Sequence, residues 1–148
     1  MTTAAYDLGR FVEAQDRVLP RARAELQAGR KQSHWMWFIF PQLAGLGSSA
    51  TAREYAISSL DEARAYLGHE LLGQRLRECT HLVNEVQGRT IEQIFGYPDY
   101  LKFRSCMTLF ARTAAAADDA DGARVFRTAL EKYFAGEEDA LTAGLLSP

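Results

Sequence analysis

The chain has 148 residues, of which 47% are hydrophobic and 24% are charged, as expected for one globular domain with a buried core. Its net charge of −2 argues against a general nucleic-acid-binding surface, and no apolar run approaches the ~18 residues that span a bilayer. The N-terminal residues lack the basic-then-apolar pattern of a secretory signal. We therefore expect a cytoplasmic protein that has neither nucleic acid nor a membrane as its partner.

Apolar residues recur at helical spacing from Leu8 to Leu19, which predicts a first helix that Asp7 can cap. Pro20 suits the first turn of a second helix over 21–28, and Gly29 is expected to end that helix. The sequence thus predicts two helical pieces before the most apolar part of the chain.

The segment 33–42 contains both tryptophans and two phenylalanines, and no other stretch is as aromatic. Ser33 can cap a short helix that runs to Phe40, although a buried extended segment fits so short a run equally well. We favour the helix because no partner strands stand out elsewhere. Bulky side chains gain most from burial, so the other elements are expected to surround this segment.

The rest of the chain repeats the signals of helix starts and stops. Ser59 and Thr90 begin capping boxes, Pro98 suits a first helical turn, and an aspartate precedes the helix after the loop 116–121. Ser49 or Thr51 can cap a short helix through Tyr55, and the later predicted helices cover the ranges 60–67, 71–87, 90–95, 98–115, 123–134 and 138–145. We therefore predict a single all-α domain over 1–148, with about seven helices around the aromatic segment.

Polar side chains that fall on the apolar face of a predicted helix are candidates for a site. Helical wheels place Gln15, Arg75, Asp99 and Lys102 in such positions, whereas the helix over 123–134 has none and is interpreted as scaffold. A buried arginine needs an anionic partner from the protein or from a ligand. Two interpretations remain open, namely an internal polar network and a pocket that these groups share.

Polar residues that flank the aromatic run extend this set. We include Ser33, His34 and Gln42 as candidates beside the indoles of Trp35 and Trp37, because ligand pockets combine apolar walls with a few polar groups. His34 is either a packed, hydrogen-bonded side chain or a general acid or base, and Asp99 is the second candidate for proton transfer.

Arg30 and Lys31 precede the capped start of this segment, where free backbone N–H groups favour an anion, but an ordinary basic turn is the favoured alternative. The glycine-serine stretch 45–49 lacks the lysine of a phosphate-binding loop and is predicted to be a flexible turn.

Nothing in the sequence indicates a metal ion or a cofactor. The three histidines are scattered, and Cys79 and Cys106 lack zinc-ligand spacing and fall on apolar helix faces, as small buried thiols do. Nucleophile-elbow, zinc-protease and dinucleotide-binding motifs are absent from the sequence.

Four segments of the chain form a recognisable set: FVEAQ at 11–15, GRKQSHWMWFIFPQ at 29–42, YAISS at 55–59, and FGYPD at 95–99 with Leu101, Lys102 and Ser105. Together they resemble a bacterial family of proteins of unknown function, numbered eighteen-ten (DUF1810). The resemblance implies a small, multihelical, stand-alone domain and implies no established activity. Some members carry the label calpastatin, but inhibitors of that type resemble disordered chains, whereas this chain has the periodicity of a packed domain.

Two functions follow as hypotheses from the residues. The first is a domain that binds, and can process, a small anionic and nucleotide-like ligand against the tryptophans. The second is a protein-interaction or regulatory module without a small-molecule ligand, which an exposed tryptophan patch would favour. The sequence gives no indication of the oligomeric state.

Overall fold

The structure is a computed structural model that describes residues 6–146, and within that range the chain is helical. The nine helices of these residues are α1 (Gly9–Gln27), α2 (Met36–Ile39), α3 (Ala50–Glu54), α4 (Leu60–Gly68), α5 (Glu70–Asn84), α6 (Ile91–Phe95), α7 (Asp99–Ala116), α8 (Ala120–Phe134) and α9 (Ala140–Leu146). The β-pairing in the described range is one isolated parallel bridge between Leu43 and Ile57. The all-α prediction is confirmed, with several short helices beyond the long ones.

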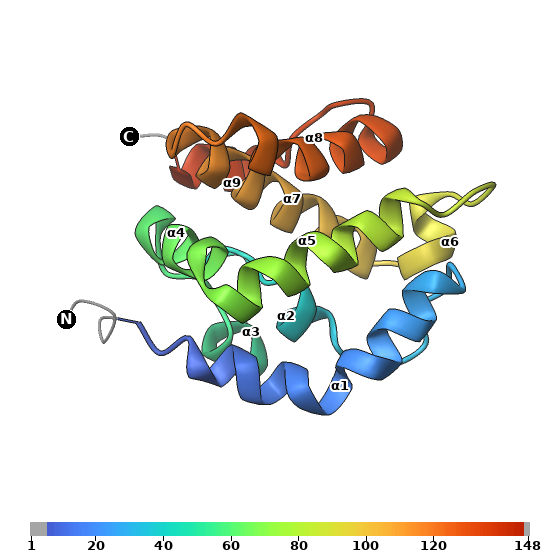
Figure 1. The fold of residues 1–148 in the computed structure, drawn as a ribbon, viewed down its shortest axis with the longest axis horizontal. Coiled ribbons are helices and arrows are strands. Elements are labelled where there is room, and N and C mark those ends of the chain that lie inside the picture. Colours follow the sequence, from blue (N-terminus) through green and yellow to red (C-terminus); the bar gives the residue numbers. More distant parts are fainter. Residues whose placement is uncertain (1–5, 147–148) are drawn as a thin grey trace.

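The short helix α2 lies at the centre of the molecule (Figure 1). It contacts α1, α5 and α7, while α8 packs along α7 and α5. Trp35 and Phe40 at the two ends of α2 are buried. The rings of Phe40, Phe95 and Phe103 then join α2 to α6 and α7, with centroids 4.8–5.8 Å apart. The aromatic segment is therefore central because the longer helices bury it from several directions.

Several helix ends follow the local capping signals. The hydroxyls of Ser49 and Ser59 accept backbone N–H groups of α3 and α4, and Thr90 forms a complete capping box with Gln93 at α6. At Ser59 the box is incomplete, because the carboxylate of Glu62 accepts the N–H of Ser58 instead. Such ends are readable from the sequence because both partners lie within four residues.

Three boundaries near the N-terminus were predicted incorrectly. Pro20 lies inside α1, which is one continuous helix, because the buried face of Leu19, Ala22 and Leu26 crosses the proline without interruption. Asp7 does not cap α1, whose N-cap is Leu8. Ser33 does not cap α2 either, since that helix starts only at Met36 and its N-cap, Trp35, makes no side-chain cap.

One polar face of α7 is covered in the structure. Thr108 is fully buried and its hydroxyl accepts the N–H of Asp139, while Arg104 and Arg112 pair with the carboxylates of Glu137 and Glu138. The segment before α9 folds over this side, and a wheel for one helix carries no information about such a neighbour.

Within residues 6–146, none of the helices is both long and apolar enough to cross a membrane.

Candidate functional site

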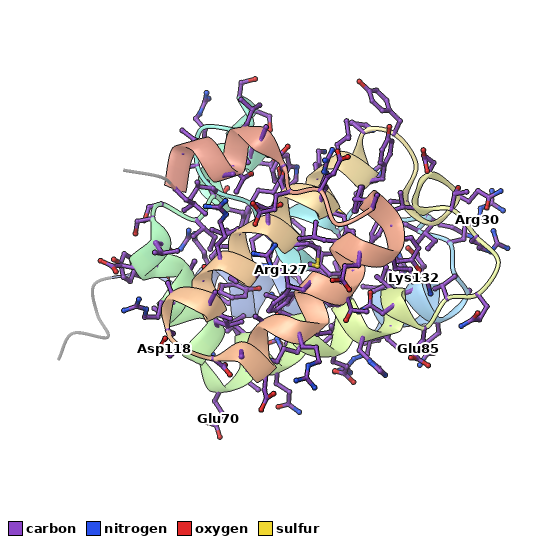
Figure 2. The ribbon with its side chains drawn as sticks, turned by 90° about the horizontal axis from the view of Figure 1, so that it is seen from above. Arg30, Glu70, Glu85, Asp118, Arg127 and Lys132 are labelled. Atoms are coloured by element: carbon purple, nitrogen blue, oxygen red, sulfur yellow. The ribbon has the colours of Figure 1, made fainter. Side chains whose placement is uncertain are left out.

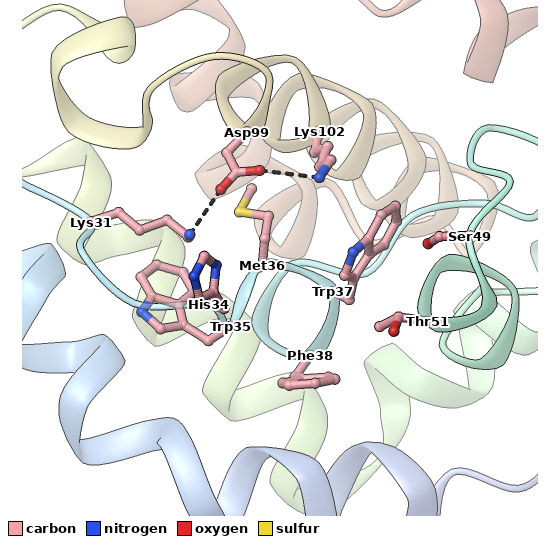
Figure 3. A pocket seen from close by; sticks show the side chains of 10 residues that line it. All are labelled: Lys31, His34, Trp35, Met36, Trp37, Phe38, Ser49, Thr51, Asp99 and Lys102. Carbon is pink, nitrogen blue, oxygen red and sulfur yellow. Dashed lines mark ion pairs between the residues drawn. The ribbon is translucent and has the colours of Figure 1, made fainter.

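A cavity of about 340 Å³ opens beside α2, where three segments meet (Figure 3). The loop into α2 and α2 itself form one wall, the start of α3 forms a second, and the first turn of α7 forms a third. The lining residues are Lys31, His34, Trp35, Met36, Trp37, Phe38, Ser49, Thr51, Asp99 and Lys102. An apolar, aromatic surface with a few charged groups is the usual make-up of a small-molecule site.

A cluster of three charges lies at one edge of the cavity. The Nζ atom of Lys31 lies 2.8 Å from one carboxylate oxygen of Asp99, and the Nζ atom of Lys102 lies 3.2 Å from the other. The Lys31 side chain is only 7% exposed, so this ammonium group needs the carboxylate as its partner. Two positive charges thus share one negative charge, which leaves the cluster with a surplus of one.

The pKa of Asp99 reflects the same geometry. Burial raises the pKa of this carboxyl, but hydrogen bonds and charges from Lys31 and Lys102 outweigh burial, and the pKa lies below its ordinary value. Asp99 is therefore ionised at neutral pH with both oxygens occupied, which makes it a counter-charge and a poor proton donor.

Aromatic rings hold the two ammonium groups from the other side. The Nζ atom of Lys102 lies 4.6 Å from the ring centroid of Trp37, and that of Lys31 lies 5.2 Å from that of Trp35. The chain contains only three lysines among 17 basic residues, and two of them line this cavity. Because an ammonium group is a compact charge with three donors, both lysines can turn toward an anion without leaving the rings.

Glu25 fixes the loop that carries Lys31 and Trp35. Its carboxylate accepts hydrogen bonds from the backbone N–H groups of Gln32 and Ser33, from the Ser33 hydroxyl and from the Trp35 indole, at 2.6–3.0 Å. Burial raises the pKa of Glu25, but these four donors together lower it to about 2. The sequence analysis missed Glu25. The usable signal was a carboxylate in the last turn of a helix predicted to end at a glycine, followed by a turn rich in hydrogen-bond donors.

Gln15 and Arg75 do not line the cavity. The amide of Gln15 donates to the carbonyl of Phe38 and to the Tyr66 hydroxyl, while Arg75 donates to Gln15 and Asp16. These two residues form the internal polar network that the sequence left open, and they support α2. They do not converge with Lys102 on one pocket.

The remaining candidates are distributed around the site. Ser33 is held by Glu25 and does not line the cavity. Arg30 is exposed and lies at one end of the molecule (Figure 2). Gln42 is buried and lines an adjacent pocket of about 280 Å³ that shares Trp37 with the cavity, and its amide nitrogen has no hydrogen-bond partner among the described residues. His34, Trp35 and Trp37 do line the cavity.

Four lining residues escaped the sequence analysis, namely Met36, Phe38, Ser49 and Thr51. Ser49 and Thr51 come from the start of α3, which the chain reaches only after the glycine-serine turn. No sequence signal connects that turn with α7, so only the fold brings their side chains together.

The described residues contain no group of three or more histidine, cysteine or acidic side chains that could hold a metal ion. Cys79 and Cys106 are buried as expected, and burial raises the pKa of both thiols, to about 12 for Cys79. Neither thiol is therefore a reactive group at neutral pH.

The protein is thus a small all-α domain with a cavity that is lined by lysines and walled by aromatic rings. The chain belongs to the family described as Protein of unknown function (DUF1810), whose match covers residues 5–146. It is similar to the crystal structure of the conserved hypothetical protein Rv1873 from Mycobacterium tuberculosis, with 58% sequence identity and a TM-score of 0.91 over 96% of this chain and 97% of that chain. No curated protein matches the chain.

Proposed function

We propose that this protein binds a small anionic ligand in the cavity beside α2. The observation that carries the proposal is the charge cluster, in which Lys31 and Lys102 share the single carboxylate of Asp99. An incoming phosphate or carboxylate replaces part of that shared charge and accepts donors from both ammonium groups. The half-buried indole of Trp37 offers a surface for a flat ring, so the proposed ligand class includes nucleotide-like molecules.

The roles of the two candidate proton-transfer groups differ in this proposal. Asp99 positions the lysines, because both of its oxygens are engaged with ammonium groups. His34 is exposed at the edge of the cavity and is the group assigned to proton transfer if the bound ligand is processed.

The alternative, a protein-interaction module, requires an exposed aromatic patch. Trp35 is only 1% exposed, and Trp37 is half-buried and lines a concave cavity. This burial supports the small-ligand proposal over the alternative.

Thermal shift and tryptophan fluorescence with nucleotides, sugar phosphates and dicarboxylates test the proposal. A ligand at 100 times its dissociation constant should stabilise the protein by about 2.7 kcal/mol. Lys102→Met should abolish this shift but change the free energy of unfolding by only about 0.5 kcal/mol, because Asp99 keeps its partner Lys31.

The matched control is Arg124→Met, which removes one positive charge at a side chain that is 76% exposed on α8. This variant should keep the ligand-induced shift. Absence of any shift across the panel, or marked unfolding of Lys102→Met, would argue for a purely structural ion cluster.

Asp99→Asn tests the assigned role of the carboxylate. Removing the charge that competes with the ligand should raise the affinity for phenylphosphonate about tenfold, measured by isothermal titration calorimetry. Phenylphosphonate is a suitable probe because it combines one anionic group with one aromatic ring. Unchanged or weaker binding by this variant would show that Asp99 does not act as a counter-charge to the ligand.

A further inference from the structure

A second groove lies next to the cavity and is larger, at about 680 Å³. It runs along α1 where Pro20 interrupts the ladder of backbone donors, and the turn before α2 forms its other side. Its lining residues are Arg17, Val18, Pro20, Arg21, Gln32, Ser33, His34 and Trp35.

The groove and the cavity share a wall. His34 and Trp35 line both of them, and Figure 3 shows both residues at the Lys31 side of the cavity. Trp35 is buried and held by Glu25, whereas His34 is exposed. A ligand that extends past His34 therefore passes from the lysines of the cavity into the groove beside α1.

Two arginines line the groove, and the carboxylate that contacts its opposite side, that of Glu25, is already occupied by Gln32, Ser33 and Trp35. Arg17 and Arg21 are exposed, and neither side chain forms a hydrogen bond or an ion pair within residues 6–146. Their neighbours on α1 and α5 behave differently, since Arg23 pairs with Glu78 and Arg75 pairs with Asp16. Among the residues that the structure describes, no acidic side chain lines the groove itself.

Taken together, the two hollows contain two lysines, two arginines and one carboxylate, on a chain whose net charge is −2. The positive charge is therefore a local feature and does not follow from composition. Guanidinium groups bind phosphate and carboxylate oxygens in pairs, and unpaired ones beside a hollow are free to do so.

We infer that the ligand of this site carries two anionic groups joined by a linker. One group binds between Lys31 and Lys102, the other binds to Arg17 and Arg21, and the linker crosses His34. The chemical class is a bis-anionic small molecule, such as one with two phosphate groups. This inference rests on the proposed function and specifies its ligand.

Alkyl phosphonates test the inference by isothermal titration calorimetry. A series of bisphosphonates with short, medium and long polymethylene spacers is compared with monophosphonates of the same chain length. The best-fitting bisphosphonate should bind about tenfold more tightly than its monophosphonate, because the second group gains charge-assisted hydrogen bonds.

The double variant Arg17→Met with Arg21→Met should abolish that tenfold advantage and leave monophosphonate binding unchanged. Both arginines are exposed and unpaired, so the variant should fold normally. The matched control, Arg89→Met with Arg124→Met, removes two exposed arginines that line neither hollow and should retain the advantage.

The outcomes separate this inference from the proposed function. If the monophosphonate binds and Lys102→Met abolishes its binding, but the second phosphonate adds nothing or its effect survives in the Arg17 and Arg21 variant, the two-anion inference is wrong and the proposed function stands. If no phosphonate of any length binds the unmodified protein, both are wrong.

Discussion

Gly73→Ala should lower the free energy of unfolding by about 3 kcal/mol, measured by urea denaturation. A Cβ atom at this position would lie 2.1 Å from the carbonyl oxygen of Leu67 at the end of α4. Because the obstacle is backbone, it cannot rotate away as a side chain would. The corner between α4 and α5 must therefore open, which disturbs the buried contacts of Tyr66 and Leu72.

Gly68→Ala is the matched control at the same corner. A Cβ atom added there has no neighbour within 4 Å, and Gly68 lies in the last turn of α4. Alanine also has the higher helix propensity, so this variant should be neutral or slightly stabilising. Equal effects of the two substitutions would show that the close approach of Leu67 does not limit position 73.

Glu25→Gln should lower the free energy of unfolding by about 2 kcal/mol at neutral pH. The carboxylate accepts four hydrogen bonds from Gln32, Ser33 and Trp35, whereas an amide offers a single acceptor atom and faces these donors with its NH₂ group. Trp35 fluorescence should change together with stability, and ligand affinity should fall because the loop that carries Lys31 loses its anchor.

The pH dependence gives a second readout for Glu25. Its pKa falls from an ordinary value of 4.5 to about 2 in the folded protein, so the ionised carboxylate stabilises the fold above pH 4.5. That contribution is lost as the pH falls from about 4.5 toward 2. The difference in stability between the unmodified protein and Glu25→Gln should therefore narrow over this range.

Glu78→Gln is the control for charge removal. Glu78 is 45% exposed and pairs with Arg23 at the surface, so its replacement should cost less than about 1 kcal/mol. A Glu25→Gln variant as stable as Glu78→Gln, with no narrowing at acid pH, would contradict the anchoring role of Glu25.

Within the site, the sequence identified the charged side chains more successfully than the ion pairs that they form. Lys31, Asp99 and Lys102 were each singled out from local patterns, and the structure brings them into one cluster. Asp99 and Lys102 lie three residues apart on one helix, so a wheel alone places their side chains next to each other. The sequence could not indicate the contact between Lys31 and Asp99, which are 68 positions apart, since a helical wheel describes one helix alone.

Gln15 and Arg75 illustrate the other side of this limit. Their position on apolar faces indicated polar groups with partners inside the fold, and in the structure Gln15 is buried while Arg75 is partly exposed. Which partners they meet depends on how α1 and α5 pack against α2, and there Gln15 donates to the carbonyl of Phe38 and not to the cavity. A polar residue on the apolar face of a helical wheel can therefore be either a structural hydrogen-bonding group or a ligand-binding group, and the wheel does not distinguish the two.

The sequence by itself determined that the chain is all-α, where α4 and α6 begin, and that the tryptophan segment lies at the centre. These features depend on interactions over a few residues and on the burial of bulky apolar side chains, and both can be inferred from short stretches of sequence. Only the tertiary structure decided that Glu25 holds the loop before α2, that α3 and α7 complete the cavity, and that a second, arginine-lined groove adjoins it. Those contacts join segments far apart in the chain, and their geometry follows from how whole helices pack.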